Sequence, residues 1–257
     1  MDPISTVTTS RGNVPNVALL DRTRSTGRLR LDQIPYRIET TRATLRAWSP
    51  DDAAMFFATV DAAREDLRRW LEWVDSIRSE ADAAAMLRSA RGRFDLMMDF
   101  AWACIARDGT LAGGLMCHLL DPSTARVSLT YWLAPKARGE GLGREAVRGL
   151  TSALLEQGGV ERVEVFVDVN NRESRSLAEA VGFRREGVLQ KALSRRGQPY
   201  DVVLFAIVGE LPPPRERTTT TARLETKRRV DAPAGDGPPS VGAPAGERQG
   251  PPRDAAH

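Results

Sequence analysis

The residues best suited to chemistry lie in one stretch, residues 131–144, which reads YWLAPKARGEGLGR. An apolar segment with strand character leads through a proline-bounded turn into the start of a helical pattern, with alternate glycines at Gly139, Gly141 and Gly143. Glycines at such a turn let main-chain N–H groups approach an anion closely, and the helix start adds a partial positive charge. The stretch therefore predicts a cradle for a pyrophosphate group.

Two better-known phosphate motifs do not fit this stretch. A P-loop needs Gly-Lys-Ser/Thr after its glycines, and no such triplet follows Gly143. The dinucleotide-binding fingerprint needs a different glycine spacing. The residues thus favour a phosphate-binding turn of another kind.

The elements that position this turn can be predicted from periodicity and turn residues. Ser49-Pro50 is typical of a helix start, Asp108-Gly109 of a hairpin, and Gly182 of a helix end. The pattern predicts strands over 36–48, 100–107, 111–120, 125–134, 160–169, 183–189 and 200–208, and helical segments over 50–74, 79–94, 145–155 and 172–181. This order indicates an α/β or α+β domain with a mixed sheet.

The two ends of the chain differ in composition from its middle. Residues 1–34 carry a net charge of +2, residues 212–257 another +2, and residues 35–211 therefore −1 of the total +3. The last segment starts with three prolines and has too few apolar residues to fold, so we expect a disordered Pro/Gly/Arg-rich tail over 212–257. We also expect a disordered extension over 1–34 and one folded domain over 35–211, whose balanced charge does not favour a nucleic-acid surface.

Several motifs together resemble the GNAT superfamily of N-acetyltransferases. The pattern Arg138-x-x-Gly141-x-Gly143 after a strand resembles its acetyl-CoA loop, and the segment from Asn171-x-x-Ser174 to Gly182-Phe183 resembles its second signature. Upstream, Trp70-Leu71-Glu72-Trp73 is similar to the RimJ/RimL branch, named for N-terminal acetylation of ribosomal proteins, although two core aromatic residues would look the same. The resemblance covers about residues 36–211 and implies a single domain with a mixed, mostly antiparallel central sheet flanked by helices.

The resemblance also implies roles for individual residues. The main chain of Tyr131, Trp132 and Leu133 is expected to pair with the pantetheine arm of acetyl-CoA, the cosubstrate. Asn171 is expected to bind the amide end of the cofactor and Ser174 to protonate the departing thiolate, although both also suit a helix N-terminus. The expected pyrophosphate site is made of Gly139, Glu140, Gly141, Leu142, Gly143 and Arg144, with Arg138 either touching phosphate or solvated.

The chain departs from the family at the positions that usually move protons. Ala178 stands where many members have a tyrosine acid, and members with a carboxylate base place it at positions matching Phe166, Ser128 or Leu193. Four other residues remain as candidates for the base, each with a surface or core role as the default, namely Asp168, Glu164, Asp201 and His118.

A site poor in bases favours an acceptor amine of low pKa. Deprotonating a lysine amine at pH 7 costs about 4–5 kcal/mol, whereas an α-amine costs only about 1.4 kcal/mol. We therefore expect direct attack of a protein or peptide α-amine, or of a small amine, on acetyl-CoA in a ternary complex. The alternatives are a degenerate acyl-CoA-binding sensor or partner module, which the missing acid and base would explain, and a nucleic-acid-binding protein acting through its basic tails.

The composition of the chain indicates its cellular compartment and argues against a zinc site. No apolar run reaches the ~20 residues of a membrane span, and the first twenty residues do not resemble a secretory signal. Cys104 and Cys117 lie in apolar stretches, so we expect two reduced thiols and a cytoplasmic protein. With only His118 and His257 available to join these cysteines, we expect no zinc site.

Overall fold

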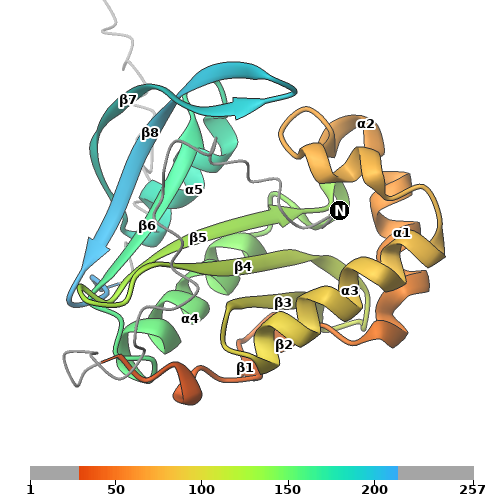
Figure 1. Cartoon of the computed structure of the whole chain (residues 1–257), viewed down its shortest axis with the longest axis horizontal. Helices are drawn as coiled ribbons and strands as arrows, with labels where there is room; N and C mark the ends of the chain where they lie inside the picture. Colours follow the sequence, from red (N-terminus) through yellow and green to blue (C-terminus); the bar gives the residue numbers. More distant parts are fainter. Residues whose placement is uncertain (1–28, 214–257) are drawn as a thin grey trace, which may run out of the picture. The chain divides into compact units, whose positions relative to one another are not determined.

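The computed structural model of the chain describes residues 29–213. One eight-stranded sheet has the order β1-β2-β3-β4-β5-β6-β8-β7, and only the pair β5 and β6 is parallel (Figure 1). The strands are β1 (Arg37–Glu39), β2 (Ala43–Ala47), β3 (Asp99–Ala106), β4 (Leu111–Asp121), β5 (Arg126–Leu133), β6 (Arg162–Asp168), β7 (Arg184–Arg195) and β8 (Gln198–Val208). The predicted mixed, mostly antiparallel sheet flanked by helices is confirmed.

Helices cover both faces of this sheet. Five α-helices are present in the described part, namely α1 (Ala53–Ala62), α2 (Arg64–Leu67), α3 (Glu80–Asp95), α4 (Leu142–Glu156) and α5 (Arg172–Val181). Short 3₁₀ turns join them, namely η2 (Leu31–Gln33), η3 (Pro50–Asp52), η4 (Glu72–Ser76) and η5 (Pro135–Ala137). None of the helices within residues 29–213 is both long and apolar enough to cross a membrane.

Two apolar cores lie on opposite faces of the sheet. One packs α4 and α5 against the inner strands around Leu129, Leu150 and Phe205. The other packs α1 and α3 against β3 and β4 around Val60 and Leu87. Since side chains alternate along a strand, β5 contributes Leu129 and Tyr131 to the first face and Trp132 to the second.

The parallel pair β5 and β6 opens after a short contact. Their ladder runs from Arg126 opposite Arg162 to Ser128 opposite Glu164, although both strands continue for several residues. The two strands lie together at one end and separate toward the other (Figure 1). Within residues 29–213, the edge of β5 from residue 129 onward therefore has no strand partner on the β6 side, while its other edge stays paired with β4.

Most predicted elements are present, but the strand expected over 36–48 is wrong as a single element. It is a hairpin in which Ile38 on β1 pairs with Leu45 on β2, closed by a bond from the Thr40 amide to the Ala43 carbonyl. The helical stretch expected over 50–74, which precedes the third predicted helix, is divided into α1 and α2 at Ala63, where the backbone leaves the helical region at φ −109° and ψ 8°. Val74, expected in that stretch, lies in η4.

Residues 29–34, expected in the N-terminal extension, pack on the domain. Ile34 is only 3% exposed, and the Arg30 amide donates to the Gly158 carbonyl at 2.7 Å. At the other end, the Pro212 carbonyl accepts from the Arg148 guanidinium at 2.7 Å. The remaining parts of the predicted disordered extension and tail, 1–28 and 214–257, lie outside the described residues.

Candidate active site

The glycine turn predicted from the sequence forms the start of α4. Gly139 and Gly141 have φ of 89° and 83°, which side-chain-bearing residues rarely adopt, and Gly141 is the N-terminal cap. A Cβ on Gly139 would meet nothing within 4 Å, so the main chain there faces open space. A bare, outward-facing main chain at a helix start suits a phosphate group, and the residues present thus fit the predicted diphosphate site.

The other residues of this turn hold it in place. Leu142 is 9% exposed and belongs to the core beneath α4, so only its main chain can face a ligand. The guanidinium of Arg42 donates to the Glu140 carbonyl, and the Arg42 amide donates to the Glu145 carboxylate at 2.6 Å. Arg144 lies in the first turn of α4 and is partly exposed.

Arg138, whose side chain is 30% exposed, is bound by three groups of the protein. Its guanidinium donates to the Leu133 carbonyl at 2.9 Å and to the Asp66 carboxylate at 2.5 Å. A third, longer contact of 3.5 Å joins it to Glu173 at the start of α5. Arg138 thus links the end of β5, α2 and α5 in the structure.

The predicted residues Tyr131, Asn171 and Ser174 meet across the opening between β5 and α5. The Asn171 side chain caps α5 by accepting from the Ser174 amide at 3.0 Å. The Ser174 hydroxyl donates to the Tyr131 hydroxyl at 3.1 Å, which in turn donates to the Ser174 carbonyl at 3.1 Å. Burial raises the pKa of Tyr131 to about 12, so this phenol stays protonated.

A pocket of about 140 Å³ opens on the other face of the sheet, beside Trp132. Its walls come from η4 and the chain before it, from α1 and α3, from β4 and β5, and from the β7–β8 hairpin. Aromatic rings supply much of the lining, namely Trp48, Phe56, Trp70, Trp73, Trp132 and Tyr200. The glycine at position 114 makes room for two of these rings, because a Cβ there would stand 2.7 Å from the indole nitrogen of Trp132.

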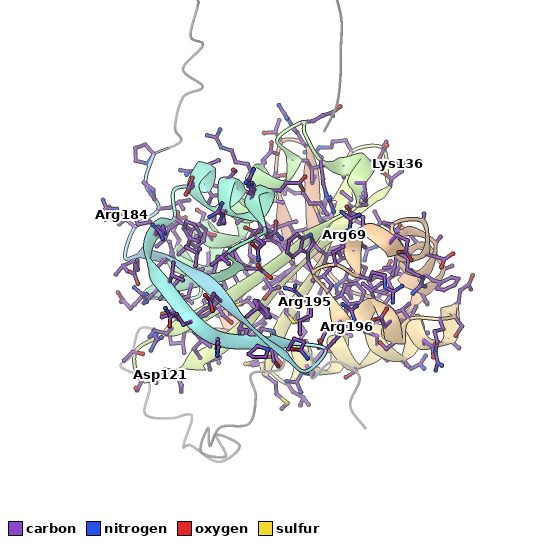
Figure 2. The ribbon with its side chains drawn as sticks, turned by 90° about the horizontal axis from the view of Figure 1, so that it is seen from above. Arg69, Asp121, Lys136, Arg184, Arg195 and Arg196 are labelled. Carbon is purple, nitrogen blue, oxygen red and sulfur yellow. The ribbon has the colours of Figure 1, made fainter. Side chains whose placement is uncertain are left out.

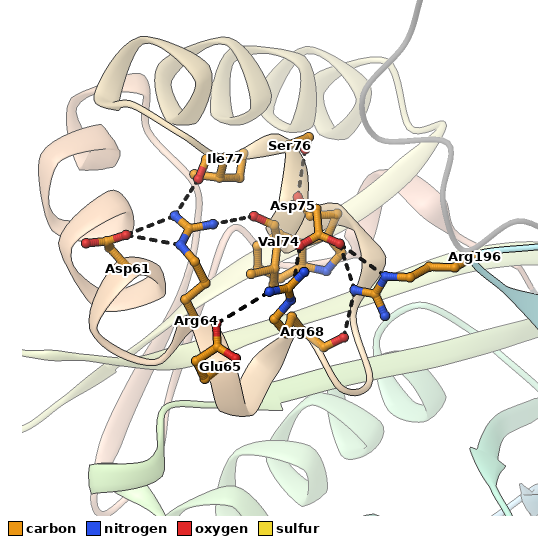
Figure 3. A network of polar contacts seen from close by, with 10 residues as sticks. Asp61, Arg64, Glu65, Arg68, Val74, Asp75, Ser76, Ile77 and Arg196 are labelled. Carbon is orange, nitrogen blue, oxygen red and sulfur yellow. Dashed lines mark hydrogen bonds and ion pairs between the residues drawn. The ribbon is translucent and has the colours of Figure 1, made fainter.

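The tip of the β7–β8 hairpin is fastened over this pocket. Arg196 donates to the Asp75 carboxylate at 2.7 Å and to the Arg68 carbonyl at 2.9 Å (Figure 3). Hydrogen bonding by Arg196 lowers the pKa of Asp75, and the charge of Arg68 adds to the effect. Arg195 lies next to Arg196 in this hairpin (Figure 2). Its guanidinium lies 4.4 Å from the Tyr200 ring centre and 5.3 Å from that of Trp70.

Three polar side chains of the pocket have a buried atom without a hydrogen-bond partner among the described residues. These atoms are Oε1 of Glu72, Nε2 of His118 and Nε of Arg195. The sequence had singled out His118 as a candidate base, whereas Glu72 had been noted only as part of a motif. A polar atom buried without a partner is costly, and therefore indicates a place where a ligand or water binds.

The three carboxylates proposed as bases from the sequence are held by other groups. Glu164, 1% exposed, accepts from Arg162 at 2.6 Å and from Arg126 at 2.8 Å. The carboxylate of Asp168 accepts from Arg195 at 2.9 Å and from the amide at position 170 at 2.8 Å. Asp201 accepts from the amide at position 191 at 2.8 Å.

The four positions where the family usually carries an acid or base have structural surroundings here. Ala178 is fully buried in the core between α5 and the sheet. Ser128 pairs with His118 across β5 and β4, and Leu193 lines the pocket from the hairpin. Phe166 pairs with Leu204 on β8.

Comparison with known proteins adds a family match to this geometry. The model of the acetyltransferase (GNAT) domain matches residues 42–184. The uncharacterized N-acetyltransferase YoaA of Bacillus subtilis (strain 168) is 26% identical over 172 residues, which cover 66% of this chain and 96% of YoaA. The ribosomal-protein-serine acetyltransferase of Escherichia coli (strain K12) is 25% identical over 145 residues, or 54% of this chain and 78% of that protein.

Solved structures share the fold. The ribosomal L7/L12 alpha-N-protein acetyltransferase RimL, in complex with coenzyme A, superposes with a TM-score of 0.62 at 20% sequence identity. The superposition covers 68% of this chain and 97% of RimL. The resemblance to the RimJ/RimL branch drawn from the sequence is therefore confirmed by the relatives.

Proposed function

Because the chain belongs to the GNAT acetyltransferase family, we propose that it transfers the acetyl group of acetyl-CoA to the α-amine of a protein or peptide. Transfer of acetyl from acetyl-CoA to an amine follows from the family, and the relatives belong to the RimJ/RimL branch. The choice of an α-amine is our proposal. It is supported by the absence of a carboxylate at the usual base positions and by the similarity to RimL, an alpha-N-protein acetyltransferase, and to the ribosomal-protein-serine acetyltransferase.

One observation carries this proposal, namely that the open edge of β5 and the aromatic pocket share residues. Thr130, Tyr131 and Trp132 lie on the part of β5 that has no β6 partner, and all three also line the pocket. An acyl donor along this edge would therefore present its thioester to whatever amine the pocket holds. Holding two reactants in one place supplies much of the rate enhancement of acyl transfer.

We assign the donor side of the site to the residues predicted from the sequence. The main chain of Tyr131, Trp132 and Leu133 pairs with the pantetheine arm as an added strand, and one of its N–H groups binds the developing oxyanion. Asn171 caps α5 and faces the amide end of the arm, while Ser174 donates a proton to the thiolate. The diphosphate lies on the turn made by Gly139, Glu140, Gly141, Leu142, Gly143 and Arg144, which Arg138 braces from behind.

The Tyr131–Ser174 contact supports this role for Ser174. The serine hydroxyl points at a phenol that burial keeps protonated, and that phenol already donates to a carbonyl. A thiolate leaving beside Ser174 would take the serine proton, and the phenol would stabilise the serine oxygen by reorienting its own hydrogen. Tyr131 is therefore a positioning residue for Ser174 in this proposal.

Release of free coenzyme A tests the function directly. We would incubate the full chain with acetyl-CoA and a synthetic peptide that carries a free N-terminal serine, and detect free thiol. The matched control is the same peptide with its N-terminus blocked by acetylation, so that the side chain of one internal lysine is its free amine. The chain's own thiols do not disturb the assay, because Cys104 and Cys117 are buried and burial raises both pKa values, that of Cys104 to about 12.

Three outcomes separate the proposal from the alternatives. Thiol release with the serine peptide but not with its blocked form supports α-amine transfer. Release only with the lysine-bearing peptide contradicts the choice of acceptor. Binding of acetyl-CoA without release from any amine would indicate the acyl-CoA sensor instead.

We further propose that residues 29–213 suffice for activity and that the protein works in the cytoplasm. The contacts of Arg30 and Pro212 with the domain fix the ends of this fragment. Two buried free thiols suit a reducing compartment. Activity of the fragment equal to that of the full chain would support the first statement and exclude a function that depends on the basic tails.

A further inference from the structure

His118 is held by a carboxylate on the neighbouring strand. Its Nδ1 lies 2.8 Å from Oδ1 of Asp99, because β3 and β4 pair these two residues directly. Asp99 also accepts from Nε of Arg93 on α3 at 2.7 Å. Its side chain is 13% exposed, and burial opposes its ionisation, but the bonds from His118 and Arg93 prevail and hold the pKa of Asp99 below its usual range.

This arrangement fixes which nitrogen of the ring carries the proton. An ionised carboxylate accepts hydrogen bonds only, so Nδ1 of His118 must donate to Asp99. In the neutral ring, the lone pair is then on Nε2, which can accept a proton. Arg93 keeps Asp99 charged and in place, so the orientation of His118 depends on a three-residue chain.

The Nε2 lone pair of His118 is available in the pocket, because no group of the described residues binds it. The side chain lines the pocket, and its Nε2 is buried without a partner among the described residues. A buried acceptor with no partner is what a proton-accepting group needs before its substrate binds. The titratable or charged side chains that line the pocket with it or hold it in place are Glu72, Arg93, Asp99, Tyr131, Arg195 and Tyr200.

We propose that His118, positioned by Asp99, is the catalytic base that takes the proton from the acceptor amine. This rests on the proposed acetyl transfer to an amine. Asp168 and Asp201 are bound by an arginine and a main-chain amide, and Glu164, which keeps one unpartnered oxygen beside its arginines, does not line the pocket. His118 is therefore the sequence-derived candidate with an open acceptor in the pocket.

The proton balance is simple. Nε2 of His118 takes one proton from the acceptor ammonium, and the freed nitrogen lone pair forms the C–N bond with the thioester carbonyl carbon. The C–S bond breaks, and the second proton of the nitrogen reaches the departing thiolate through the Ser174 hydroxyl. The imidazolium then returns its proton to water, so the products are the amide, coenzyme A as thiol, and one proton.

The test compares kcat/KM against pH for the wild type and His118→Gln, with the free-serine peptide as acceptor. Wild-type kcat/KM should rise with pH and then level off. His118→Gln should lose about 10²-fold near pH 7. The loss should shrink as the pH approaches the pKa of the α-amine, about 8, because the substrate then arrives deprotonated. Added imidazole should restore part of the activity.

Two further variants separate a catalytic role from a structural one. Asp99→Asn should lower kcat with little change in KM, because the ring loses its orientation but the pocket remains. Coenzyme A affinity and thermal stability of His118→Gln should match the wild type. Should Asp99→Asn fail to fold, the pH profile of His118→Gln decides alone.

Several results would overturn the proposal. The first is full activity of His118→Gln. The second is a loss of His118→Gln activity that is equal at every pH. The third is a pH dependence of kcat/KM that Glu72→Gln abolishes and His118→Gln retains. Failure of the proposed function would differ, because the wild type itself would release no thiol with the serine peptide.

Discussion

Replacing Gly141 by valine tests the turn that we propose as the diphosphate site. The residue has φ of 83°, and a Cβ there would lie 3.2 Å from Nη1 of Arg42, whose guanidinium braces the Glu140 carbonyl. A side-chain-bearing residue in this conformation costs about 1–2 kcal/mol. The variant's turn should therefore relax away from the cradle, and coenzyme A must restore it on binding. The free energy needed to restore the turn raises the dissociation constant for coenzyme A by about 5–30-fold.

Gly109→Val is the matched control for this change. Gly109 has the same φ of 83° in the β3–β4 turn, and a Cβ there would meet nothing within 4 Å. Only Gly141→Val should bind coenzyme A more weakly by calorimetry, whereas Gly109→Val should bind it like the wild type. A dissociation constant for Gly141→Val within about twofold of both the wild type and Gly109→Val would refute the assignment of the cradle.

Three further predictions concern the pocket and the fold. Arg196→Ala should raise the KM for the peptide a few-fold and leave coenzyme A affinity unchanged in calorimetry, because it frees the hairpin tip but its ion pair is partly exposed. Glu72→Gln should raise the peptide KM about tenfold in the thiol assay, since the pocket loses the carboxylate that attracts an ammonium. Asp52→Asn should cost about 1–3 kcal/mol in urea denaturation at pH 7, because Asp52 binds an arginine of β2 at 2.6 Å. Burial raises the pKa of Asp52, but the bonds from that arginine and from the Ser49 amide outweigh it, and the pKa lies below the usual value. The stability it adds is therefore present above the unfolded pKa of about 3.9 and is lost as the pH falls through the folded value, so the variant and the wild type should converge in acid.

Features that depend on local chemistry could be predicted from the sequence. Ser49 and Ser79 cap helical segments, Asn171 caps α5, and Gly182 ends it, as their types and positions indicated. The glycine turn also lies where the strand-to-helix pattern placed it. These features need only a few consecutive residues, so no tertiary contact has to be known in advance.

The hairpin over 36–48 shows why a local pattern can fail. Its turn at Thr40-Thr41-Arg42 contains no glycine, proline or asparagine, and the closing bonds come from Thr40 to the Ala43 carbonyl. A threonine hydroxyl can stabilise such a turn, but it is equally common inside a strand. Alternation alone therefore could not separate one long strand from two short ones.

The aromatic pocket beside Trp132 could be predicted only in part. Asp99 and His118 face each other because β3 and β4 form a hairpin, but the register shifts between Cys104 and Ile105, so the predicted turn at Gly109 does not by itself give their pairing. Glu72 and Arg195 come from elements that meet only through tertiary packing, fastened by the bond between Arg196 and Asp75. Their separation along the chain leaves no spacing signal to read.

Acetyl transfer to an α-amine held beside the open edge of β5 is the central step that we propose for this protein. Mass spectrometry of the serine peptide after incubation with the chain and acetyl-CoA tests this most directly. We predict the addition of one acetyl group at the N-terminal nitrogen, with an equal amount of coenzyme A released and no product from the blocked peptide. An unmodified peptide, or an acetyl group found only on the lysine side chain, would contradict the account.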